Sequence, residues 1–152
     1  MFPVVKSNVT AKYTTSAGQS IANGSDVVVD FETKVYDTHD IVTTGGSWKA
    51  TAKISGKYKI NAHVLWQSNA WAVGNIYYLA LFKNGSIDYA YSYYQVETTA
   101  SISRPMDICT EIELLAGEYI DIRAFQNTGT IGILSNAKHN WIEVSRIGHY
   151  SG

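Results

Sequence analysis

The sequence contains little cysteine, little proline and little charge, and each shortage excludes a class of protein. Its 152 residues include one cysteine, Cys109, and two prolines, which excludes a disulfide within the chain and a proline-rich linker. Charged residues make up 16% of the chain, the net charge is -1 and lysine and arginine form no cluster, so nucleic acid is not an expected partner. No apolar run reaches the length of a membrane span, so no membrane partner is expected either.

Sequence signals of catalysis are missing as well. There is no Gly-x-Ser-x-Gly elbow and no helical segment that could seat one, and the strand carboxylates alternate as solvent-facing residues rather than as a pair across a cleft. We therefore expect no enzyme, no catalytic residues and no cofactor. Asp37-Thr38-His39-Asp40 offers oxygen ligands of the kind Ca²⁺ uses, but fewer than the six it needs. We favour a solvated loop there and leave metal binding open.

An alternation of apolar and polar residues fills the middle of the chain. Between residues 56 and 66 every second side chain is apolar, which predicts a half-buried β-strand. Asn84-Gly85 separates two further strand-like segments and predicts a tight hairpin. Eight or nine such segments and no helical period predict an all-β fold, an antiparallel β-sandwich with jelly-roll topology.

The domain prediction divides the chain at residue 20. Residues 1–20 mix small polar and apolar types without a strong dry face, which suggests an extended N-terminal arm for attachment. Residues 21–152 are expected to form the jelly-roll domain. The first residues lack the charged and apolar regions of a secretory signal, so we expect a chain that is made without such a leader.

The order and spacing of several short segments resemble the C1q/TNF-like jelly roll, in particular its divergent members in phage and bacterial fibre-like proteins. The matching segments are Phe31 with Asp37, Trp48, Gly56-Lys57-Tyr58, Lys83-Asn84-Gly85, Leu114-Leu115-Ala116-Gly117-Glu118-Tyr119-Ile120 and Asn140-Trp141-Ile142-Glu143-Val144. The resemblance covers roughly residues 20 to 148 and implies a C1q/TNF-like fold and a homotrimer. Val42 and Lys49 stand where complement-type domains usually carry aromatics, so receptor or immune functions are not carried over.

The segment from residue 75 to residue 83 is apolar on both faces. A single sandwich covers one face only, and further copies around a three-fold axis would cover the other. The predicted trimer interface consists of Tyr77, Leu79, Leu81, Tyr89, Tyr91 and Tyr93. The alternative is that a loop of the same subunit covers the second face.

Two functions follow as hypotheses. The first is a non-enzymatic structural or adhesion module of a virion, either a capsid decoration or a tail or head fibre protein, that binds a capsid or fibre protein through its arm. A secreted or cell-surface location, as part of a larger protein, is the alternative to the virion. The second is a lectin-like module that binds surface glycans through Trp71, with Asn69 and Asn75 beside it. Trp71 buried under its own loop is the alternative.

Overall fold

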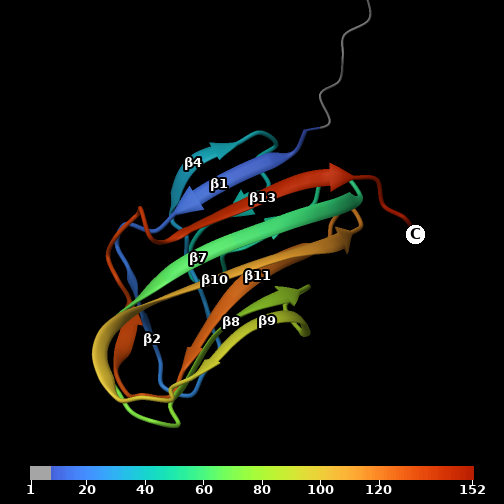
Figure 1. The fold of residues 1–152 in the computed structure, drawn as a ribbon. Coiled ribbons are helices and arrows are strands. Elements are labelled where there is room, and N and C mark those ends of the chain that lie inside the picture. The colour runs from blue at the N-terminus through green and yellow to red at the C-terminus, as the bar shows by residue number, and fades with distance from the viewer. Residues whose placement is uncertain (1–7) are drawn as a thin grey trace, which may run out of the picture.

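The computed structural model describes residues 8–152, which fold into two antiparallel sheets packed face to face (Figure 1). Every strand pairing in the two sheets is antiparallel. The prediction of an all-β sandwich is therefore confirmed. The described residues form no helix that is long and apolar enough to cross a membrane.

The seven-stranded sheet is built around β7, the longest strand of the structure. Along one path its strands are β2 (Gln19–Ile21), β12 (Ile131–Ile133), β7 (Gly56–Trp71), β13 (Trp141–Gly148), β1 (Thr10–Thr14) and β4 (Thr33–Asp37). The seventh strand, β10 (Ala100–Leu114), pairs with β7 along its other side. β10 is thus an edge strand of this sheet.

The six-stranded sheet covers the other side of the core. Its strands are, in order, β5 (Val42–Thr43), β6 (Lys49–Thr51), β11 (Tyr119–Gln126), β8 (Ile76–Lys83) and β9 (Ile87–Gln95), with β3 (Val27–Val28) beside β11. Asn84 and Gly85 have φ angles of 53° and 75° and form the turn from β8 to β9. The predicted Asn-Gly hairpin is confirmed, and it leaves β9 at the edge of the sheet.

The core lies between the two sheets and follows the alternation read from the sequence. The apolar positions of β7 are at most 1% exposed: Tyr58, Ile60, Ala62, Val64 and Trp66. Alternate residues of β11, Ile120, Ile122 and Ala124, are fully buried and belong to the same core cluster. Since successive side chains of a strand point to opposite faces, the outward residues of β11 are Tyr119, Asp121, Arg123 and Phe125.

The predicted N-terminal arm is wrong for the residues that the structure describes. β1 lies between β13 and β4 inside the seven-stranded sheet, and β2 pairs with β12. Val9, Ala11 and Tyr13 are at most 3% exposed in the core. The jelly-roll domain therefore includes residues 8–20, and the remainder of the proposed arm, residues 1–7, lies outside the described residues.

Candidate functional site

The six residues predicted for a trimer interface fall into two groups. Tyr77, Leu79 and Leu81 are at most 4% exposed and belong to the core between the sheets. Their assignment to an interface is wrong, because the odd-numbered side chains of β8 point toward the other sheet of the same chain. Tyr89, Tyr91 and Tyr93 on β9 lie at the surface instead and are 47%, 49% and 56% exposed.

The outward face of β8 is covered by neighbouring strands of the same chain. Tyr78 stacks on Phe125 of β11 with ring centroids 4.7 Å apart. The guanidinium of Arg123 lies 4.0 Å from the ring centroid of Phe82, and Ala80 is fully buried. The two-faced apolar character of β8 therefore requires no second copy of the chain, since side chains of the adjacent strands provide the cover.

Two long strand edges run along one side of the sandwich. β9 ends the six-stranded sheet and β10 ends the seven-stranded sheet (Figure 1), and within residues 8–152 neither has a strand partner on its outer side. The two edges are close together, because Arg104 of β10 lies 5.6 Å from the ring centroid of Tyr94 of β9. We call β9, β10 and the exposed Tyr89, Tyr91 and Tyr93 the open side.

The outer face of the seven-stranded sheet is polar and carries matched charges. Lys12 of β1 forms an ion pair with Glu143 of β13 at 3.0 Å, and Lys59 of β7 stands opposite Glu111 of β10. His63 stacks on Trp141 with ring centroids 5.9 Å apart. This face therefore combines neutralised charge with a partly exposed aromatic pair.

The Trp71 region does not form the predicted sugar site. Trp71 is the last residue of β7, is fully buried and donates a hydrogen bond from Nε1 to the Ile102 carbonyl at 3.0 Å. Asn69 donates to Thr128 at 3.1 Å, and Asn75 accepts from the Ala72 amide at 2.8 Å. The alternative of a buried Trp71 holds, and the two asparagines tie loops together.

Asp37 stabilises its own loop. Its carboxylate accepts hydrogen bonds from the amides of Ile41 and Val42, at 3.0 and 3.1 Å, and from the Tyr13 hydroxyl at 2.9 Å. Burial and the hydrogen bond to Asp37 raise the pKa of Tyr13 well above its ordinary value. Among residues 8–152 no three His, Cys, Asp or Glu side chains gather as metal ligands, so the structure brings no cation cage together here.

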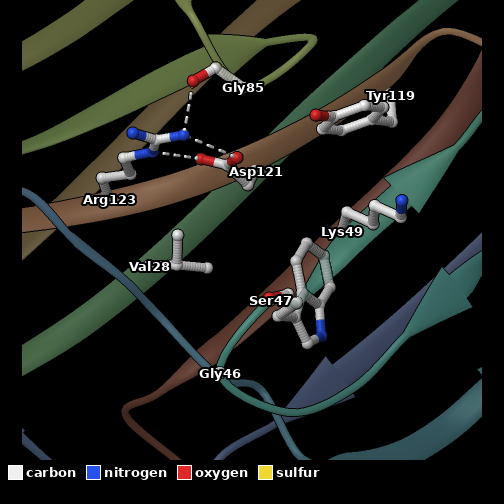
Figure 2. A pocket seen from close by; sticks show the side chains of 9 residues that line it. Val28, Gly46, Ser47, Lys49, Gly85, Tyr119, Asp121 and Arg123 are labelled. Atoms are coloured by element: carbon white, nitrogen blue, oxygen red, sulfur yellow. Dashed lines mark hydrogen bonds and ion pairs between the residues drawn. The ribbon is translucent and has the colours of Figure 1, made fainter.

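A hollow that the sequence analysis missed lies on the outward face of the six-stranded sheet (Figure 2). Its volume is about 400 Å³. It is lined by residues of β3, β6, β11 and the loops beside them: Val28, Gly46, Ser47, Trp48, Lys49, Gly85, Tyr119, Asp121 and Arg123. The alternation of β11 predicts that Tyr119, Asp121 and Arg123 point outward, but the rest of the lining comes from distant parts of the chain.

An ion pair between the buried Asp121 and the half-buried Arg123 forms one wall of this hollow. Arg123 donates from Nε and Nη2 to the two carboxylate oxygens of Asp121, at 2.9 and 3.2 Å, and from Nη2 to the Gly85 carbonyl at 2.8 Å (Figure 2). Asp121 is only 4% exposed, and its carboxylate raises the pKa of Arg123. The ammonium of Lys49 lies 4.7 Å from the ring centroid of Tyr119.

Comparison with known proteins identifies the fold. No family model and no curated protein sequence matches the chain. Among solved structures it is similar to Eiger TNF from S. frugiperda, with 13% identity, a TM-score of 0.69 and coverage of 95% of this chain and 96% of that one. Murine APRIL is 9% identical with a TM-score of 0.67, and the match covers 92% of this chain and 99% of that one. The globular domain of the zebrafish complement 1qA protein is 15% identical with a TM-score of 0.59, and the match covers 93% of this chain and 97% of that one. The chain therefore has the C1q/TNF-like jelly-roll fold.

Proposed function

We propose that this chain is a non-enzymatic interaction module that works as a homotrimer. The observation that carries the proposal is the open side, where two unpaired strand edges lie close together and exposed tyrosines of β9 stand beside them on the outer face of the six-stranded sheet. An unpaired edge presents a row of free backbone donors and acceptors, which soluble proteins normally cover or blunt. Tyrosine is enriched in protein interfaces because its ring buries a large area while its hydroxyl remains able to form a hydrogen bond.

A ring of three copies supplies the missing cover. In a three-fold assembly the contact is head to tail, so the open side of one copy meets a different surface of the next. The outer face of the seven-stranded sheet suits that role, because Lys12 and Glu143 on it form an ion pair and Trp141 and His63 offer an aromatic surface. The trimer implied by the C1q/TNF-like fold supports the same arrangement.

We place this module on a virus particle, as a capsid decoration or a fibre head that acts in attachment, stabilisation or adhesion. The support is the resemblance of the sequence to divergent phage and bacterial fibre-like members of the fold. The N-terminal residues would contact the capsid or fibre protein. Mass spectrometry of polypeptides that copurify with the native protein tests this placement: capsid or fibre proteins support it, and recovery of the chain alone from a virus-free secreted fraction contradicts it.

Light scattering coupled to gel filtration tests the trimer. We expect a mass three times that of the 16.8 kDa chain. A variant with Tyr89→Ser, Tyr91→Ser and Tyr93→Ser should run as a monomer that keeps its β circular dichroism spectrum. The matched control replaces two exposed residues outside the open side and outside the Lys12–Glu143 surface, with Val35→Ser and Tyr150→Ser, and should remain trimeric.

Two results would contradict the trimer proposal. One is a wild-type protein that stays monomeric at micromolar concentration. The other is a control variant that dissociates as readily as the open-side variant, which would show that general loss of surface aromatics, and not the open side, governs assembly.

A further inference from the structure

The hollow on the six-stranded sheet has the size of a small-ligand site. Its volume of about 400 Å³ lies in the range of roughly 300–1,000 Å³ that such sites occupy. Apolar surface from Val28 and Tyr119 lies beside the charged groups of Lys49, Asp121 and Arg123 (Figure 2). All of these residues belong to one chain, so the site does not depend on the proposed trimer.

Asp121 supplies fixed hydrogen-bond acceptors in the wall of the hollow. A carboxylate has about four acceptor positions, and Arg123 engages each oxygen once. The bidentate contact holds the carboxylate in one orientation, between Arg123 on one side and Tyr119 on the other (Figure 2). The remaining acceptor positions suit hydroxyl donors of a ligand and exclude a second anion from this wall.

Lys49 supplies a cation at the opposite rim. Its ammonium is held over the Tyr119 ring by a cation–π contact, and no carboxylate among residues 8–152 forms an ion pair with it. Arg123 is neutralised by Asp121, so Lys49 leaves the lining with one positive charge in excess. That charge favours a ligand with one anionic group placed away from Asp121.

We infer that the hollow binds an acidic sugar, a pyranose that carries one carboxylate. The sugar carboxylate pairs with Lys49, ring hydroxyls donate to Asp121, and the apolar face of the ring packs against Val28. A neutral sugar leaves Lys49 without its partner, and a simple carboxylate leaves Asp121 unused. The buried Trp71 region takes no part in this site.

Saturation-transfer NMR and isothermal titration calorimetry on the full chain test the inference with sodium glucuronate and sodium N-acetylneuraminate as probes. For glucuronate, which has about a dozen heavy atoms, we expect a Kd on the order of 1 mM. Glucose and acetate each lack one of the two recognised groups and should bind at least about tenfold more weakly. Binding of either acidic sugar supports the inference. The sugar with the lower Kd shows whether the hollow prefers the carboxylate of glucuronate or that of N-acetylneuraminate.

Lys49→Met removes the ammonium and keeps most of the side-chain volume. This substitution should weaken glucuronate or N-acetylneuraminate binding at least about tenfold, because it deletes one charge-assisted contact. Lys53→Met is the matched control, since Lys53 is exposed and does not line the hollow, and it should bind like wild type. Equal thermal midpoints for the two variants show that any difference concerns binding.

Gly46→Phe blocks the hollow without changing its charge. Gly46 lines the hollow, no atom lies within 4 Å of a Cβ there and its φ is not in the left-handed region, so a larger side chain is tolerated at this position and we expect it to fill the hollow and abolish binding. The inference is overturned if wild type shows no saturation transfer to either acidic sugar. It is also overturned if Lys49→Met or Gly46→Phe binds like wild type, or if Lys53→Met loses as much affinity as Lys49→Met.

Discussion

Trp71, the residue predicted to bind a sugar, is instead part of the core. Its indole is fully buried, donates to the Ile102 carbonyl and lies 5.6 Å from the guanidinium of Arg104. Trp71→Ala leaves a cavity and an unpaired carbonyl, so we expect a loss of about 3–5 kcal/mol in the free energy of unfolding. Urea denaturation followed by circular dichroism measures this loss. Val73→Ala, at a site that is 65% exposed, should change it by less than about 0.5 kcal/mol.

Glu32 makes stability depend on pH. Burial acts to raise its pKa, but hydrogen bonds outweigh burial, among them those from the Ser16 and Ala17 amides at 2.8 and 3.3 Å, and lower the pKa from 4.5 to about 2. A carboxylate with a lowered pKa stabilises the folded state above its unfolded pKa, and that contribution is lost as the pH falls through the folded value.

Glu32→Gln should therefore destabilise the protein most at neutral pH. The gap in unfolding free energy between wild type and variant should be constant above about pH 5 and shrink toward about pH 2. Urea denaturation at a series of pH values measures it. Glu97→Gln removes the same charge from an exposed side chain and controls for net charge; a gap that grows on acidification would contradict the prediction.

At the scale of the element, the alternation of β7 fixed its buried face because only one of its faces is apolar. β8 is apolar on both faces, so no pattern in it says which residues point inward, and the prediction that Tyr77, Leu79 and Leu81 face outward is wrong. The register between β10 and β7 shifts between Ile102 and Arg104, and such a bulge changes which residues face the core. For this reason Trp66 and Trp71, one even and one odd, are both buried.

The pairing of β2 with β12 depends on Gly132. A Cβ at this position would overlap the backbone carbonyl of Gln19, which is part of the ladder and cannot move aside. Gly132→Ala should therefore cost about 1–3 kcal/mol of unfolding free energy. Gly46→Ala is the matched control, because a Cβ there meets no atom within 4 Å, and it should leave stability unchanged or raise it by up to about 1 kcal/mol. Equal urea midpoints for Gly132→Ala and Gly46→Ala would contradict the prediction that a Cβ at position 132 overlaps the Gln19 carbonyl.

At the scale of the whole molecule, the two layers followed from local signals and the sites did not. Alternation and the Asn84-Gly85 turn are properties of neighbouring residues, so they could be read from the sequence. The hollow joins Lys49 of β6 to Asp121 and Arg123 of β11 through sheet pairing between segments about 70 residues apart. The embedding of β1 between β13 and β4 also joins the two ends of the chain, which no local pattern of residues 1–20 reveals.

Assembly should make thermal stability depend on protein concentration. If three chains separate as they unfold, a hundredfold rise in total concentration stabilises each folded chain by two thirds of RT ln 100, about 1.8 kcal/mol. For a chain of 152 residues this shift raises the thermal midpoint by about 4–7 °C. Differential scanning calorimetry across that concentration range measures it. The open-side variant with Tyr89→Ser, Tyr91→Ser and Tyr93→Ser should show one midpoint at every concentration, and a wild-type midpoint that is equally constant would mean that folding requires no partner.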